Sequence, residues 1–237
     1  MKHVHYILTG LSLVLVLLSA NRLLPSTRGM LPPHDFLRVV DINAMLPIPL
    51  ASVLLYFYLK KNVEENGKLL NKKFLTFASL LFVAGVYLFG AGSGLHEAMD
   101  YLNARFCDRG ELKNELCNIV SYNDDTFSHV IYYLGFILLT VSLVATEYFS
   151  PRKHAVSSKD VKLVLANALF IALFIFANLA FEPTLMDMIV FGSMTVLTLS
   201  TLMFGKHSYK LLPVTFYFAV SYGVGVTSSL LYKIIMA

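Results

Sequence analysis

Charged side chains are scarce in this chain of 237 residues. Asp, Glu, Lys and Arg together make up only 14% of the sequence, whereas apolar residues make up 57%. A soluble domain needs roughly a quarter of its residues to be charged in order to cover its surface. The composition therefore excludes an ordinary soluble protein and indicates an integral membrane protein.

The sequence also lacks the motifs of several protein classes. It contains no glycine-rich nucleotide loop, no zinc-finger spacing, no internal repeat and no long polar linker. Its formal net charge is +4, but the Lys and Arg residues are dispersed among the loops, so nucleic acid is not expected as a partner. One membrane domain that covers residues 1–237 is the simplest organisation.

Long hydrophobic runs are what the sequence does contain. A run of about 18 or more apolar residues can cross a hydrocarbon layer of about 30 Å as a helix. Seven segments come close to this length, so we predict an all-α, polytopic membrane protein with seven transmembrane helices. The predicted helices are residues 6–18, 42–59, 74–103, 125–149, 161–181, 185–204 and 211–236. The first run is short and follows Lys2, so the alternative to a retained helix is a signal peptide that ends near Ala20.

The positive charges predict how the chain is oriented. If the N-terminus is cytoplasmic, most of the 19 Lys and Arg residues fall on the cytoplasmic side, chiefly in the loops around residues 60–73 and 152–162. An excess of positive charge on short loops marks the cytoplasmic side, so we predict an N-in, C-out orientation.

The two cysteines bear on the same question. Cys107 and Cys117 both follow the third predicted helix, in a loop that this orientation places outside the cytoplasm. Non-cytoplasmic compartments permit disulfides, so we predict a Cys107–Cys117 bridge, with two unpaired thiols as the alternative.

Ionisable side chains gather where the third predicted helix ends and the fourth begins. Such groups are costly within a membrane span unless they are paired, hydrated or bound to a ligand. His96 and Asp100 lie four residues apart, as do Asp125 and His129, so each pair shares one helix face. Consecutive spanning helices run in opposite directions, so both imidazoles lie one turn deeper than the carboxylates if the two faces meet.

Two imidazoles with one or two carboxylates suit zinc, iron or manganese. Zinc with an open coordination position lowers the pKa of bound water to about 7, which provides a hydroxide that can attack an ester or amide. The candidate metal ligands are His96, His129, Asp100 and Asp125. The candidate catalytic residues are Glu97, Asp124 and Ser93. The structural alternative is that Asp124 caps the fourth helix, and that His–Asp hydrogen bonds only fasten the two helices together.

The motif Gly92-Ser93-Gly94-Leu95-His96, together with Asp100 or Asp125, resembles the superfamily of alkaline ceramidases and adiponectin-type receptors. These are seven-helix membrane hydrolases that hold zinc. In that superfamily the Ser lies four residues before the His, whereas the interval here is three. Two further His ligands lie four apart on its last helix, and the last predicted helix here has no His. The resemblance implies a zinc-dependent hydrolase in which His129 replaces those ligands.

The first functional hypothesis is therefore a metal-dependent hydrolase, embedded in the membrane, that acts near the outer face on a lipid-like ester or amide. An ion- or proton-coupled transporter or binding protein that uses the same His and Asp residues is the alternative. A haem protein with His96 and His129 as ligands is the third possibility. The expected partners are membrane lipids and a lipid-like small molecule. Further polar residues that could complete the site are His34, Asp35, Asp41, Asn178, Glu182 and Asp187.

Overall fold

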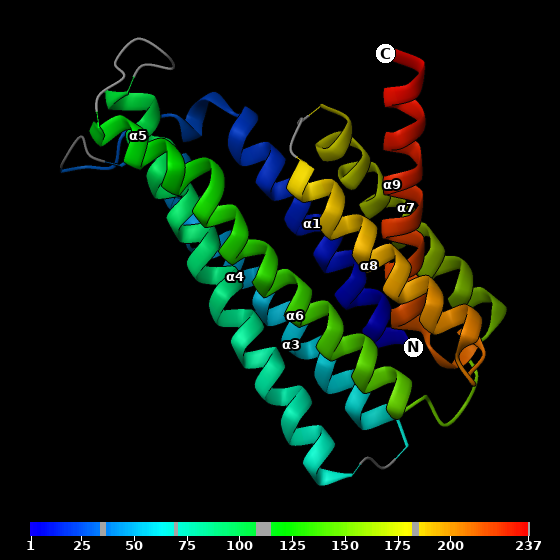
Figure 1. Ribbon diagram of the computed structural model, residues 1–237. Helices are drawn as coiled ribbons and strands as arrows, with labels where there is room; N and C mark the ends of the chain where they lie inside the picture. The colour runs from blue at the N-terminus through cyan, green and yellow to red at the C-terminus, as the bar shows by residue number, and fades with distance from the viewer. Residues whose placement is uncertain (34–36, 69–70, 108–114, 182–184, 237) are drawn as a thin grey trace. The chain divides into compact units, whose positions relative to one another are not determined.

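The computed structural model describes residues 1–33, 37–68, 71–107, 115–181 and 185–236. Nearly all of these residues are helical (Figure 1). The α-helices are α1 (Lys2–Leu23), α2 (Val39–Met45), α3 (Pro47–Asn66), α4 (Lys72–Phe106), α5 (Glu115–Tyr122), α6 (Ser128–Phe149), α7 (Ser158–Phe181), α8 (Leu185–Phe204) and α9 (Pro213–Met236). Two short 3₁₀ helices are η1 (Pro25–Thr27) and η4 (Tyr209–Leu211), and η3 (Asn123–Phe127) is a π turn.

Seven helices in the described part of the chain are long and apolar enough to cross a membrane. They cover Lys2–Leu23, Val39–Asn66, Lys72–Phe106, Glu115–Phe149, Ser158–Phe181, Leu185–Phe204 and Pro213–Met236. The predicted all-α class and the predicted number of long apolar helices are thereby confirmed. The fourth helix is longer than expected, because it begins at Glu115 and continues through the polar residues 123–126 that looked like its boundary.

The contacts divide the chain into two compact units. Unit 1 consists of Met1–Ser12, Leu55–Leu81 and Thr140–Ala237, and unit 2 consists of Leu13–Leu54 and Phe82–Leu139. Every predicted metal-binding and catalytic residue lies in unit 2.

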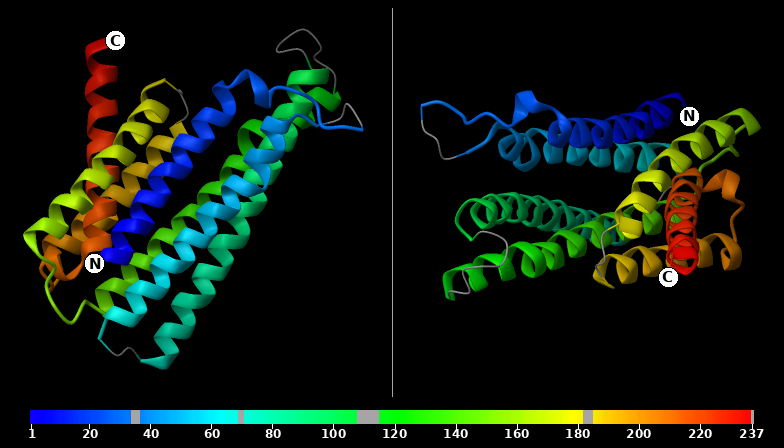
Figure 2. Two further views of the ribbon diagram at one scale, coloured as in Figure 1. Left: turned by 180° about the vertical axis from the view of Figure 1, so that it is seen from behind. Right: turned by 90° about the horizontal axis from the view of Figure 1, so that it is seen from above.

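In unit 1, α9 packs against both α7 and α8 (Figure 2). The Ser221 hydroxyl donates a hydrogen bond to the Ala168 carbonyl of α7 at 3.2 Å. The start of α9 is held by Glu147, whose carboxylate accepts hydrogen bonds from the backbone N–H groups of Val214 at 3.0 Å and Thr215 at 2.7 Å. Because the first N–H groups of a helix have no partner within it, this carboxylate acts as a cap supplied by α6.

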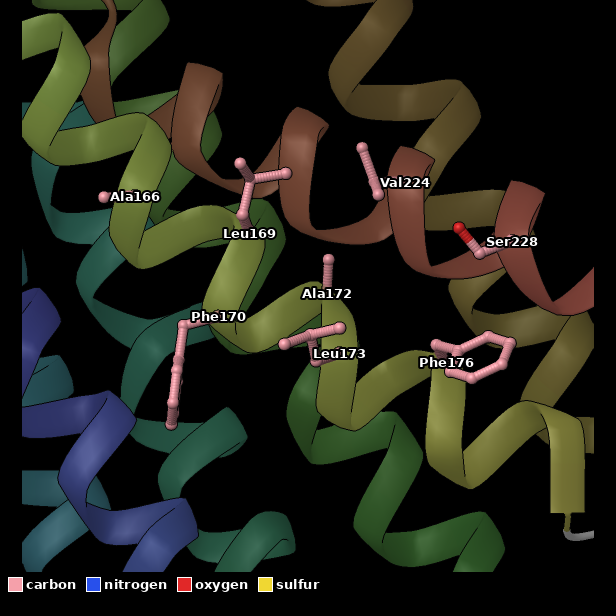
Figure 3. Close-up of a pocket in the computed structure, with 8 residues that line it drawn as sticks. All are labelled: Ala166, Leu169, Phe170, Ala172, Leu173, Phe176, Val224 and Ser228. Carbon is pink, nitrogen blue, oxygen red and sulfur yellow. The ribbon is translucent and has the colours of Figure 1, made fainter.

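An apolar groove of about 550 Å³ runs between α7 and α9 within unit 1 (Figure 3). Its lining includes Leu169, Phe170, Leu173 and Phe176 of α7, with Val224 and Ser228 of α9. The described residues that line it include no titratable side chain.

In unit 2, α4 and α6 approach each other closely at two glycines. A Cβ atom added to Gly92 would lie 2.4 Å from the backbone nitrogen of Tyr132, and one added to Gly135 would lie 2.2 Å from that of Phe89. Only glycine permits two helix backbones to lie so near each other at these points. This contact brings the polar end of α4 against the start of α6.

The predicted disulfide is confirmed. Cys107 and Cys117 are bonded, with their Cα atoms 5.4 Å apart, and they join the end of α4 to α5. Both side chains are buried beside Val120.

Candidate functional site

The two histidines singled out by their spacing lie side by side. The ring centroids of His96 on α4 and His129 on α6 are 4.9 Å apart. The close approach at Gly92 and Gly135 allows this, because it sets the two helix faces against each other within two turns of the imidazoles. The condition under which the two imidazoles come together, that these two faces meet, therefore holds in the structure.

The π turn determines which acid joins the imidazoles. Hydrogen bonds in a π turn run from residue i to residue i+5, so Asp124, five residues before His129, aligns with it. The Asp124 side chain is only 4% exposed, whereas Asp125 is exposed. The four-residue spacing that favoured Asp125 assumed a regular α-helix, and the extra residue in the turn moves Asp124 into its place.

Asp124 is in direct contact with His96. Its Oδ1 lies 3.0 Å from Nδ1 of His96, and within the described residues neither buried atom has a partner that meets the geometry of a hydrogen bond. The other oxygen, Oδ2, accepts a hydrogen bond from the Asn103 amide at 3.4 Å, and the Ser121 hydroxyl donates to Asn103 Oδ1 at 3.4 Å. A polar chain therefore runs from Ser121 through Asn103 and Asp124 to His96, with His129 beside it.

Two other predicted acids pair with arginines instead. Glu97 Oε1 lies 3.2 Å from Nη2 of Arg22. Asp100 Oδ2 lies 3.9 Å from Nη2 of Arg38, which also donates to Asp41 Oδ1 at 2.7 Å. The hydrogen bonds to Asp41 raise the pKa of the Arg38 guanidinium above its ordinary value. The short segment that precedes α3 thus supplies the partner of Asp100, and its arginine is a site residue that helix spacing alone did not identify.

Three other predicted residues make hydrogen bonds with partners other than the imidazoles. The Ser93 hydroxyl donates to the backbone carbonyl of Ala44 at 3.4 Å. Asn178 and Asp187 belong to unit 1, where they bond to each other. The predicted residues His34, Asp35 and Glu182 lie outside the described residues.

The described residues fit a metal ion only in part. Within the described ranges, no group of three or more His, Cys, Asp or Glu side chains is arranged to hold a metal. His96 and His129 supply two imidazoles, and Asp124 contacts Nδ1 of His96 as a carboxylate does when it orients a ligand imidazole. Asp100 and Asp125 do not join this set, so the predicted four-ligand site is not assembled.

Comparisons with protein-family models, curated proteins and solved structures find no match. The resemblance to the ceramidase and adiponectin-receptor superfamily stays a prediction.

Proposed function

We propose that this chain is a multi-pass membrane protein that binds and releases a proton at the His96–Asp124 pair, as part of ion- or proton-coupled transport or binding. The observation that supports the proposal is the 3.0 Å contact between a buried carboxylate oxygen and an imidazole nitrogen within two long apolar helices.

The physical argument rests on charge compensation. A carboxylate buried within a membrane span is costly unless a positive group lies beside it. His96 is the neighbour that can become positive, and histidine is the side chain that ordinarily changes charge near neutral pH. A proton on the imidazole creates an ion pair with Asp124. When that proton leaves, the carboxylate keeps the Asn103 amide as its side-chain donor among the described residues. The neighbouring His129 ring is positioned as the next group in a relay.

Proton movement in proteoliposomes tests the proposal. The purified protein is reconstituted with a trapped pH-sensitive dye, and an imposed potassium diffusion potential drives protons inward. We expect flux through the wild type and through Asp125→Asn, and loss of that flux in His96→Ala and Asp124→Asn. Histidine-ring NMR of the same proteins supplies a second readout, in which the His96 titration changes in Asp124→Asn. The proposal is wrong if proton flux through the wild type equals that of empty liposomes and the titration of the His96 resonances is the same in Asp124→Asn as in the wild type.

A membrane metal hydrolase is the second candidate, because two imidazoles 4.9 Å apart with an orienting carboxylate can share one divalent ion such as zinc. Water, substrate or further residues would have to complete the coordination. A haem finds less support, because ligands on opposite faces of a porphyrin are separated by the macrocycle, whereas these rings are neighbours.

Metal analysis separates the two candidates. Stoichiometric metal in the wild type that is lost in both His96→Ala and His129→Ala, together with metal-dependent hydrolysis of a lipid ester or amide, supports the hydrolase. Equal trace metal in all three proteins opposes it.

We also propose the N-in, C-out orientation, with the Cys107–Cys117 bridge on the non-cytoplasmic side of the membrane. The disulfide supports this side, because such bonds persist in oxidising compartments, and the positive loops support it independently.

A further inference from the structure

A second buried carboxyl group, far from the histidines in sequence, lacks a partner for one of its oxygens. Asp187 lies in the first turn of α8 and is 1% exposed. Its Oδ2 accepts a hydrogen bond from the Asn178 amide of α7 at 2.8 Å. Its Oδ1 is buried and has no hydrogen-bond partner among the described residues.

The same unit contains a carboxylate that is equally buried but fully bonded. Glu147 is also 1% exposed, and its two oxygens accept hydrogen bonds from Val214 N, Thr215 N and the Thr215 hydroxyl at 3.0, 2.7 and 2.8 Å. Within the described residues, the Glu147 carboxyl group accepts three hydrogen bonds, whereas the Asp187 carboxyl group accepts one. The two residues form a matched pair that differs in charge compensation rather than in burial.

Within the described residues of unit 1, no charged side chain forms an ion pair with Asp187. On α7, Lys159, Asp160 and Lys162 lie in the first turns, at the opposite end from Asn178. On α9, Lys233 lies near the C-terminal end and, within the described residues, makes no ion pair with Asp187. A buried ionised group without a counter-charge is costlier than a neutral group with one unmet hydrogen bond.

We propose that Asp187 is a second proton-binding site, held by Asn178 at the junction of α7 and α8. A proton from the water phase bonds to Oδ1 and neutralises the carboxylate, and the Asn178 amide continues to donate to Oδ2. This site lies in unit 1 and does not depend on the role proposed for His96 and Asp124.

Carbodiimide labelling tests the site directly. Dicyclohexylcarbodiimide enters apolar regions and reacts with protonated carboxyl groups. The full-length protein in detergent is treated in mildly acidic and in alkaline buffer, each with sodium or choline as the salt cation, and the modified residue is located by peptide mass spectrometry. We expect an adduct at Asp187 in acidic buffer, its loss in alkaline buffer and its loss in Asp187→Asn.

Infrared spectroscopy provides a second readout that does not require a reaction. A component of the carbonyl band of neutral carboxylic acids is expected to depend on Asp187: it is present in the wild type and in Glu147→Gln and lost in Asp187→Asn. Absence of both the adduct and the Asp187-dependent band would overturn the proposal. An adduct suppressed by sodium but not by choline at constant pH would also overturn it, because a metal cation would then occupy the site.

Discussion

At the scale of single residues, removing a buried carboxylate lowers the free energy of unfolding by an amount that depends on how many partners the carboxylate has. Asp124 has His96 beside one oxygen and Asn103 on the other. We expect Asp124→Asn to lower the free energy of unfolding by about 1–3 kcal/mol, because a polar group loses its charged partner. The 30% exposure of the His96 side chain keeps the cost below that of a fully buried pair.

Thermal unfolding of the purified protein in detergent measures this effect. Asp125→Asn is the matched control, because Asp125 is exposed on the same turn. We expect it to change the free energy of unfolding by no more than about 0.5 kcal/mol. Equal destabilisation by the two substitutions would show that the π turn, rather than the contact with His96, accounts for the cost.

Glu147 provides a second test at this scale. An amide in Glu147→Gln keeps one acceptor oxygen and places an N–H₂ group against N–H donors at the start of α9. We expect the free energy of unfolding to fall by about 1–3 kcal/mol, because the carboxyl group loses hydrogen bonds that stabilise the start of α9. In the control Glu65→Gln, an exposed carboxylate loses a 3.8 Å contact with Lys61, and the melting temperature should hardly change. A melting temperature as high as that of the wild type in Glu147→Gln would refute the capping role.

The histidines of the site could be predicted from the sequence, but their acid partner could not. The residue types and the positions of His96 and His129 near adjoining helix ends were sufficient to place them together. Choosing Asp124 over Asp125 requires knowing that one turn is π rather than α, and no glycine or proline marks that turn. The pairing of Arg38 with Asp41 is local, three residues apart at the start of α2, but its contact with Asp100 is a tertiary contact that helix spacing does not reveal.

At the scale of helices, the contact between α4 and α6 depends on which glycines face the partner. We expect Gly135→Ala and Gly92→Ala to destabilise the protein by about 1–3 kcal/mol each, because the added methyl group would overlap backbone atoms of the facing helix. Backbone atoms cannot move aside as the end of a flexible side chain can, so the helices must separate.

Gly90→Ala and Gly94→Ala are the controls. A Cβ atom at either position meets nothing within 4 Å, and alanine favours a helix by up to about 1 kcal/mol over glycine. Melting temperatures of the four variants check the prediction, which fails if the two pairs behave alike. The sequence showed a cluster of small residues, but which of them form the contact depends on the rotation of each helix.

Hydrophobic length predicted the helices themselves well, and their ends less well. The apolar runs located all seven long helices because the hydrocarbon layer imposes a minimum length. The predicted start of the fourth helix lies after the observed one, because the polar residues Asn123, Asp124 and Asp125 indicated a helix boundary. A helix satisfies its own backbone hydrogen bonds whatever the polarity of its side chains, so it continues through them.

At the scale of the whole molecule, the proposed orientation rests on the positive loops and can be tested with single added cysteines. The native cysteines are bridged, and no other cysteine is present in the sequence, so an introduced cysteine is the one free thiol in the oxidised protein. Lys68 and Ser26 are exposed, and the proposed orientation puts them on opposite sides, Lys68 inside and Ser26 outside.

We expect a membrane-impermeant maleimide to label Ser26→Cys in intact cells and Lys68→Cys only after the membrane is permeabilised. The physical reason for this pattern is that short loops rich in Lys and Arg stay on the cytoplasmic side when the chain inserts into the membrane. A shift in gel mobility after labelling with a bulky maleimide reports each site. The reverse pattern would mean that the bridge between Cys107 and Cys117 lies on the cytoplasmic side, and the proposed N-in, C-out orientation would be wrong.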